Sequence, residues 1–452
     1  MEQVKQNPLG TEKIERLLAR FAIPSIIAML VSALYNIVDQ VFIGWSVGML
    51  GNAATNVAFP LTITCTGLSL LCGIGGAANF NLCMGRGDEE RAERFAGAAI
   101  GMMVILGVVL CLGVRLFLKP MMLAFGATPD ILDYSLTYTG ITSLGFPFLI
   151  LTTAGSNLIR ADGSPRFSML CTLTGAIINT ILDPVFIFGF DMGMAGAALA
   201  TILGQFVSGL MVIGYLRHFK TVHLRLASLR PSLSYWKAIL SLGIAPFFNQ
   251  MAMMVVQIVM NNVLKHYGGA SAYGSEIPLA CAGIIAKVNM IFFSIIIGIS
   301  QGIQPIISYN YGAHNFHRVR DTYKKALTIA LCISICSFLC FQFFPRQIIG
   351  FFGSGSEEYF QFAEEYFRIF LFFTFINAIQ PITANFFTSI GKAIRGVFLS
   401  LTRQIIFLLP LIVILPMFLG IDGVMYSAPI ADFIAAVLAA IFVAREFKHM
   451  EK

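Results

Sequence analysis

Long apolar runs alternate with short polar segments along the whole chain of 452 residues. A run of about 20 apolar residues is long enough to cross a bilayer as a helix. The pattern therefore predicts an all-α integral membrane protein in which both termini lie on one side, because the number of runs is even. The 12 predicted spans lie near residues 17–44, 56–84, 96–118, 135–159, 167–190, 195–217, 238–264, 279–308, 326–344, 366–389, 397–420 and 424–444.

Composition agrees with this pattern. Hydrophobic residues make up 57% of the chain and charged residues 12%, with a mean hydropathy of +0.80. A soluble domain carries about 25% charged residues, so a soluble protein is excluded. The polar first segment lacks a small-residue cleavage site, and we expect no signal peptide.

The basic residues predict the orientation. Most of the 30 Lys and Arg residues fall on the side of the N-terminus. Such an excess marks the cytoplasmic side, so we expect both termini in the cytoplasm of a cell-membrane protein. The same distribution explains the net charge of +7 without nucleic acid as a partner. The opposite loops hold only Arg115, Lys119, Lys265, Arg346 and Arg368.

The second half of the chain repeats landmarks of the first half in the same order and at nearly constant spacing. Six spans per repeat leave the halves in the same orientation, which predicts two pseudo-symmetric six-helix bundles facing across a cleft, as in transporters. We assign 1–217 to an N-lobe, 218–237 to a cytoplasmic linker and 238–452 to a C-lobe. The repeated landmarks are AFGATPD (124–130) with FFGSGSE (351–357), Gly85 with Gly312, GMAG (193–196) with GIDG (420–423), Pro24 with Pro246, and Pro184 with Pro410.

The first span carries a carboxylate, Asp39, in the stretch ALYNIVDQVFIG (33–44). A charge near the bilayer centre costs a few kcal/mol, so it normally faces a cavity or a partner. Tyr35, Asn36 and Gln40 surround it, and Tyr35 lies one helical turn away on the same face. This grouping favours a polar cavity inside the N-lobe.

The fifth span carries a second polar group. Asn179 and Asp183 share one helical face, and Pro184 frees a backbone carbonyl one turn back. With Asn157 and Thr201 they predict an oxygen-rich pocket that suits a proton or Na⁺. Two close carboxylates would also push one pKa toward neutrality. The alternative is that Asp39 and Asp183 are unrelated and each only hydrogen-bonds a neighbouring helix.

The C-lobe carries its own intramembrane charges, Lys287, Arg403 and Asp432. Asp432 is expected to neutralise a basic partner and hold the bundle together, with a coupling role as the alternative. Met253 and Gln257 are candidates for the substrate cavity, since thioethers adapt to varied flat cationic ligands.

Several stretches resemble the multidrug and toxic compound extrusion (MATE) family, and in particular its prokaryotic MepA-like branch. The resemblance implies a V-shaped pair of lobes that exports cationic amphipathic drugs in exchange for H⁺ or Na⁺. It implies a cation site at Asp39, Asn179, Asp183 and Thr201, with Tyr35 and Asn157 as polar neighbours and Pro24 as a hinge. Some family members carry a further acid in the seventh or tenth span, where this chain offers only Asn and Gln. The stretches are ALYNIVDQVFIG, NTILDPVFIFGFDMGMAGAALAT (179–201), RADGSPR (160–166) and RQIIFLLPLIVILP (403–416).

An ion-coupled drug exporter competes with three other functions. A flippase for a lipid-linked precursor, from the same superfamily, is expected to have a more basic cavity. An intramembrane enzyme is disfavoured because all histidines lie in loops or tails and no HExxH or GxSxG occurs. An ATP-driven pump is disfavoured because the chain has no phosphate-binding loop. We expect no catalytic residues, no cofactor apart from the coupling ion, and a monomer.

Overall fold

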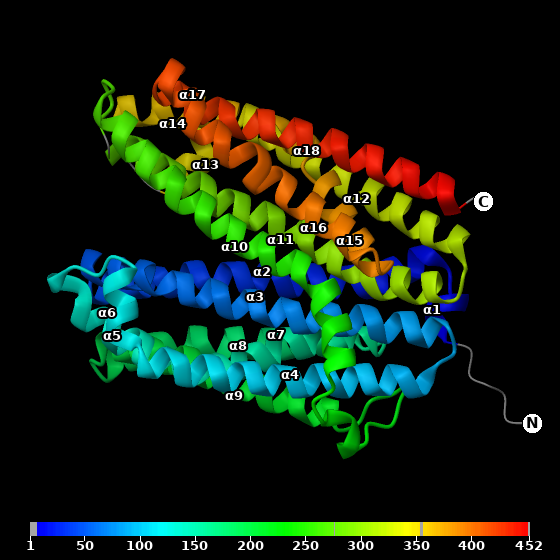
Figure 1. The fold of residues 1–452 in the computed structure, drawn as a ribbon. Coiled ribbons are helices and arrows are strands. Elements are labelled where there is room, and N and C mark those ends of the chain that lie inside the picture. Colours follow the sequence, from blue (N-terminus) through cyan, green and yellow to red (C-terminus); the bar gives the residue numbers. More distant parts are fainter. Residues whose placement is uncertain (1–6, 275, 353–355, 451–452) are drawn as a thin grey trace, which may run out of the picture.

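The computed structural model describes residues 7–274, 276–352 and 356–450, which are helical and contain no β-strand (Figure 1). Within these ranges, eleven helices are long and apolar enough to cross a membrane, and the bent pair Glu357–Ile376 and Ile379–Ser389 makes 12 if it counts as one span. The predicted all-α membrane fold is confirmed. The central residues of FFGSGSE, 353–355, lie outside the described residues.

The first half of the chain supplies one bundle. Its fourth span is broken by the 3₁₀ segment η1 (Ser143–Gly145), and its fifth ends in the π-helical segment η2 (Val185–Gly189) directly after Pro184. The helices are α1 (Pro8–Thr11), α2 (Ile14–Ser46), α3 (Met49–Gly85), α4 (Glu89–Leu116), α5 (Leu118–Ala124), α6 (Pro129–Thr142), α7 (Phe146–Ala161), α8 (Pro165–Pro184) and α9 (Gly193–Leu216).

The second half has breaks in the matching spans, but its π-helical segment precedes the repeated proline. The tenth span is interrupted by the 3₁₀ segment η4 (Phe372–Ile376), and the eleventh contains the π-helical segment η5 (Thr402–Leu408) just before Pro410. The remaining elements are η3 (Leu226–Leu229), α10 (Leu233–Gly269), α11 (Glu276–Gly312), α12 (Phe316–Phe343), α13 (Pro345–Phe352), α14 (Glu357–Phe370), α15 (Ile379–Ser389), α16 (Ala393–Leu401), α17 (Leu409–Leu419) and α18 (Ile421–Met450).

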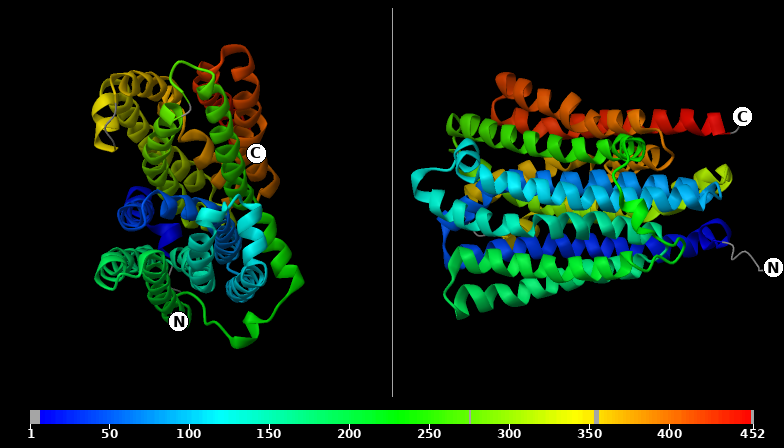
Figure 2. Two further views of the ribbon diagram at one scale, coloured as in Figure 1. Left: turned by 90° about the vertical axis from the view of Figure 1, so that its left-hand side faces the viewer. Right: turned by 60° about the horizontal axis from the view of Figure 1, so that its bottom comes forward.

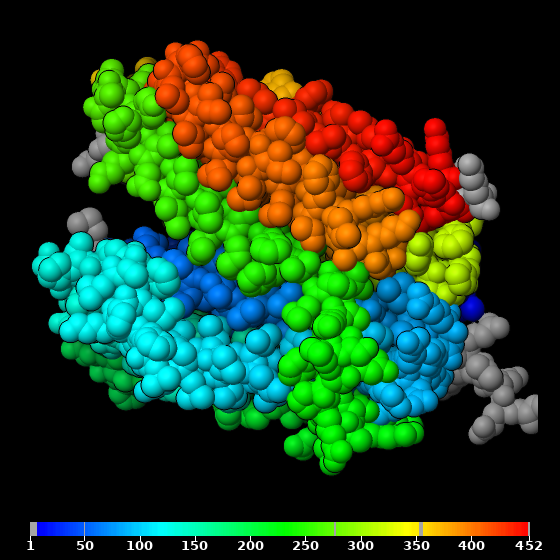
Figure 3. Space-filling model, viewed as in Figure 1, coloured from blue at the N-terminus to red at the C-terminus, as the bar shows by residue number. Residues whose placement is uncertain are grey.

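The two bundles form a V. They meet at the end where both chain termini lie, and they separate toward the opposite end, where α6 and the start of α11 are found (Figures 1 and 3). Viewed from that opposite end, the bundles form two distinct groups of helices (Figure 2). We call the two ends the closed end and the open end.

Glycines let the lobes approach backbone to backbone at the closed end. A Cβ atom at Gly243 of α10 would lie 1.9 Å from the Leu71 carbonyl oxygen of α3. Gly85 of α3 faces α11, and its Cβ position lies 2.0 Å from the Tyr309 carbonyl oxygen. Gly312 of α11 faces α3, and its Cβ position lies 2.2 Å from the Leu82 carbonyl oxygen. The repeated glycines are therefore the places where α3 and α11 cross. Only a residue without a side chain fits there.

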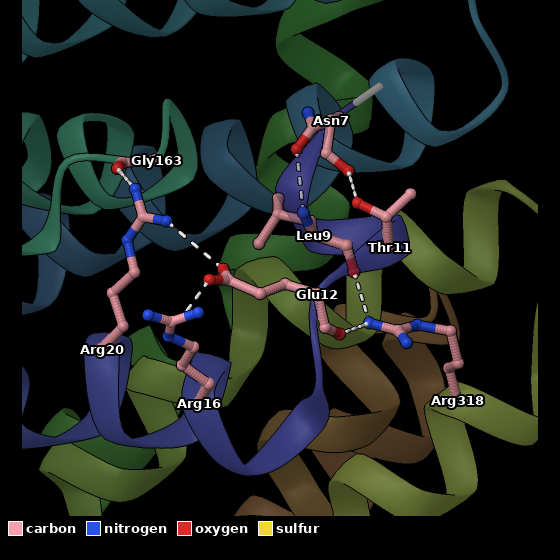
Figure 4. Close-up of polar contacts among 8 residues, drawn as sticks. All are labelled: Asn7, Leu9, Thr11, Glu12, Arg16, Arg20, Gly163 and Arg318. Carbon is pink, nitrogen blue, oxygen red and sulfur yellow. Dashed lines mark hydrogen bonds and ion pairs between the residues drawn. The ribbon is translucent and has the colours of Figure 1, made fainter. Parts of the chain in front are cut away.

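The N-terminal segment ties both lobes together at the closed end (Figure 4). Arg318 of α12 donates to the carbonyl oxygens of Leu9 (3.2 Å) and Glu12 (2.6 Å). From the start of α2, Arg20 donates to the Gly163 carbonyl of the α7–α8 loop at 3.4 Å and forms an ion pair with Glu12. The segment thus bridges the C-lobe and the N-lobe.

The linker between the lobes is held against the N-lobe by buried carboxylates. Asp162 accepts hydrogen bonds from the Tyr215 hydroxyl (2.8 Å) and the backbone N–H of Lys220 (2.7 Å). Glu93 of α4 accepts from the backbone N–H of Arg225 at 2.8 Å. Burial raises the pKa of the Asp162 carboxyl, although the hydrogen bonds that it accepts act in the opposite direction.

We predict that Gly243→Ala weakens the closed end, because the new methyl group would overlap the Leu71 carbonyl. Thermal unfolding in detergent should show a Tm lowered by several degrees. Gly214→Ala is the matched control, since this helical glycine of α9 has nothing within 4 Å of its Cβ position. The control should be neutral or stabilised by about 0.5–1 kcal/mol. Equal Tm values for the two variants would contradict the close-approach interpretation.

Candidate functional site

The N-lobe brings its two intramembrane carboxylates together. Asp39 of α2 and Asp183 at the end of α8 lie close together, and their exposures are 8% and 0%. The amide nitrogen of Asn179 donates to Thr201 Oγ1 at 3.2 Å and reaches Asp183 Oδ1 at 3.5 Å. The four residues predicted to hold a cation therefore converge from α2, α8 and α9.

This cluster has spare acceptor oxygens. Asp39 Oδ1, Asp183 Oδ2 and Asn179 Oδ1 are buried and have no hydrogen-bond partner among the described residues. A buried unsatisfied oxygen costs about 1–3 kcal/mol, and more when it is charged. Oxygen atoms of carboxylates and an amide are ligands that a proton or Na⁺ can bind. The donor set fits such an ion.

Two tyrosines stand beside the carboxylates. Tyr35 of α2 and Tyr138 of α6 are both close enough to Asp39 and Asp183 to interact with them electrostatically. Tyr138 packs in the small core around Ile43. Sequence reasoning found Tyr35 from its spacing to Asp39 but missed Tyr138, which is an uncharged residue on a separate helix.

A cavity of about 300 Å³ lies next to the carboxylate pair. The predicted residues Tyr35, Asn36, Asn157, Asn179 and Thr201 line it, whereas Asp39 and Asp183 lie behind this wall. Asp183 is therefore linked to the cavity through Asn179, which contacts it and lines the cavity.

The C-lobe closes this cavity with residues that sequence reasoning did not select. Gln250 of α10 and Gln301 of α11 line it, whereas Met253, Gln257 and Gln40 are not among its lining residues. Gln257 instead donates to Asn261 on its own helix at 2.9 Å. On a helix that is apolar on most sides, composition did not indicate which face points to the cavity.

The C-lobe charges are arranged differently. Arg403 Nε lies 2.5 Å from Asp432 Oδ1, and Asn377 donates to the other carboxylate oxygen at 2.8 Å. Arg403 also lies 5.7 Å from the ring centroid of Phe293. Lys287, the other expected partner, forms no ion pair within the described ranges. Both oxygens of Asp432 are therefore satisfied, in contrast to those of the N-lobe pair.

One candidate residue, Arg160, lies in a stretch that was expected to be a loop. The motif RADGSPR was expected to follow the fourth span, but Arg160 belongs to α7 and is 3% exposed. It also lines the 300 Å³ cavity. The charge of Arg160 had suggested a position in a loop outside the membrane.

We predict that Asp432→Asn destabilises the protein by about 3–5 kcal/mol, because it leaves the Arg403 guanidinium, whose side chain is only 12% exposed, without a counter-charge. Asp422→Asn on the same helix is the control, since Asp422 is exposed and should tolerate the change. Chemical or thermal unfolding in detergent measures both. An unchanged stability together with an altered ion dependence of transport would assign Asp432 to coupling instead.

Comparison with known proteins places this arrangement in a family. The chain is 27% identical to the multidrug export protein MepA of Staphylococcus saprophyticus and 26% identical to that of Staphylococcus aureus, over 94% of this chain and 92% of each relative. It matches a solved outward-facing multidrug resistance MATE family transporter, and a MATE in a straight conformation, each with a TM-score of 0.92 and 22% identity over the full length of both chains. The family model described as MatE matches residues 24–185 and 246–414. The match covers most of both lobes, and the chain belongs to the MatE family.

Proposed function

We propose that this protein is a secondary active exporter that exchanges cationic amphipathic compounds for H⁺ or Na⁺. The observation that carries the proposal is the buried Asp39–Asp183 pair beside a cavity of about 300 Å³. Together with Asn179, this pair has three buried oxygens that lack a hydrogen-bond partner among the described residues. The naming of its relatives as multidrug export proteins supports the same class of function.

Ion binding and drug binding compete in this scheme. Two carboxylates in a buried site repel each other when both are charged, so a proton or Na⁺ stabilises the pair. A cationic drug in the cavity benefits from the same negative charge. Binding of one therefore weakens binding of the other, and by linkage the effect is reciprocal. This competition is sufficient for exchange if each ligand is released on the opposite side of the membrane.

Helix α2 connects the ion site to the lobe interface. Pro24 is buried within α2 and lacks the N–H group that would complete the helix there. The C-lobe helix α11 contacts α2 on both sides of it, because Cβ positions at Gly302 and Gly298 lie 2.6 Å and 2.5 Å from the Cα atoms of Ala22 and Ile26. A bend at Pro24 would therefore change the lobe contact. Neutralisation of the carboxylate pair is the event that we propose drives this bend.

The basic residues assign the closed end to the cytoplasm, since both termini lie there. With this orientation the V opens to the outside of the cell membrane. The structure then corresponds to a state that releases drug outward and admits the ion. The protein acts in this scheme as a monomer.

We predict that Asp39→Asn abolishes export, because an amide cannot exchange a proton or supply the negative charge. Vesicles loaded with ethidium, with the pH gradient and the Na⁺ gradient imposed separately, measure export and identify the ion. Asp422→Asn is again the surface control. More than about half of wild-type export in folded Asp39→Asn protein would refute the coupling role.

We also predict that Asp183→Asn removes the ion sensitivity of drug binding. In detergent, wild-type affinity for ethidium should weaken as protons or Na⁺ are added, since both neutralise the site. The variant should bind ethidium with an affinity that no longer varies with either ion. Full wild-type sensitivity in the variant would place the coupling site elsewhere.

A further inference from the structure

The cavity is lined by a charge opposite in sign to the carboxylates behind its wall, the Arg160 guanidinium. The Arg160 guanidinium is 3% exposed, and its Nη2 atom donates to Asn157 Oδ1 at 2.6 Å and to Gln301 Oε1 at 2.7 Å. Both acceptors are neutral amides. In the part of the chain that the structure describes, no carboxylate lies within ion-pair distance of Arg160. A buried cation without a counter-charge is strongly disfavoured, so an anion at this position would be stabilised.

The wall beside Arg160 is also polar. Thr152, Ser156 and Arg160 are spaced four residues apart on α7, so they form one stripe along the helix, and all three line the cavity. The hydroxyl oxygens of Thr152 and Ser156 are buried and have no hydrogen-bond partner among the described residues. Two hydroxyl donors next to a guanidinium suit a carboxylate, which accepts several hydrogen bonds at once.

We propose that Thr152, Ser156 and Arg160 form an anion subsite that binds a carboxylate of the transported compound. The wall formed by Asn179 and Thr201, which contacts Asp183, lies in the same cavity and favours a cationic group. The cavity is therefore dipolar and takes molecules that carry an ammonium or iminium group and a carboxylate together. This inference rests on the proposed function, because it takes the cavity as the site of the transported compound.

Two dyes that differ only at the carboxyl group test the subsite. Rhodamine 110 carries a free carboxylate, and rhodamine 123 is its methyl ester. We expect Arg160→Gln to weaken binding of rhodamine 110 by about tenfold or more, the effect of losing a charge-assisted hydrogen bond, and to leave rhodamine 123 within about twofold. Fluorescence polarisation with purified protein in detergent measures both affinities and needs no ion gradient.

A purely structural role of Arg160 as a bridge to the C-lobe predicts a different result. In that case Arg160→Gln would change the affinities for both dyes equally, and this outcome overturns the inference. Gln301→Leu removes the bridge but keeps the guanidinium, and should preserve the preference for the carboxylate dye. Loss of that preference in Gln301→Leu would also overturn the inference.

A second variant covers the case in which Arg160→Gln does not fold. Arg160→Lys keeps the charge but cannot form the two-point contact of a guanidinium, so rhodamine 110 should lose about threefold to tenfold in affinity and rhodamine 123 should not change. Equal changes for the two dyes would overturn the anion subsite alone. Failure of wild-type protein to bind either dye would overturn the proposed function as well.

Discussion

The close backbone contact between the lobes is the constraint on which the rest of the structure depends. Four long helices, α2, α3, α10 and α11, cross at the closed end, and glycines on three of them remove the side chains that would hold the backbones apart. Within a membrane the hydrophobic effect does not favour one apolar contact over another, so close van der Waals packing at small residues supplies the association. The same helices carry or border the cavity, so the lobe contact and the site share their elements.

The two lobes use similar breaks for different chemistry. In the fifth span a π-helical segment follows Asp183 and Pro184, and in the eleventh span Arg403 lies inside a π-helical segment that precedes Pro410. Such segments displace the backbone locally and often occur at functional sites. In the C-lobe, Asp432 compensates the charge of Arg403. Asn377 donates a hydrogen bond to the same carboxylate. In the N-lobe the carboxylate pair retains oxygens that have no hydrogen-bond partner among the described residues, and for this reason we propose that the ion binds in the N-lobe.

Other buried carboxylates in the chain have structural roles, and hydrogen bonds or ion pairs compensate their charges. Asp162 accepts four hydrogen bonds, and Glu446 forms ion pairs with both Lys392 and Arg395. These groups hold the linker and the α15–α16 connection. Within the described ranges no basic side chain forms an ion pair with Asp39 or Asp183. The contrast within one protein favours a role for the pair in binding an ion over a role in packing.

The resemblance to the MATE family implied that Asp39, Asn179, Asp183 and Thr201 converge. The sequence alone determined the number and order of the spans, the two-fold repeat and the placement of Asp39, Asn179 and Asp183 within spans. Each of these follows from local rules, because hydrophobic length, helical spacing and the rarity of intramembrane acids can be read along the chain. It also indicated that Asp432 needs a basic partner.

Only the tertiary structure decided which side chains meet across helices. It paired Asp432 with Arg403 and not with Lys287, brought Gln250 to the cavity in place of Met253 and Gln257, and buried Arg160, whose charge had suggested a loop. The physical reason is that lipid and protein interior are both apolar. The hydrophobic pattern of a membrane helix therefore does not reveal which face contacts lipid and which contacts another helix.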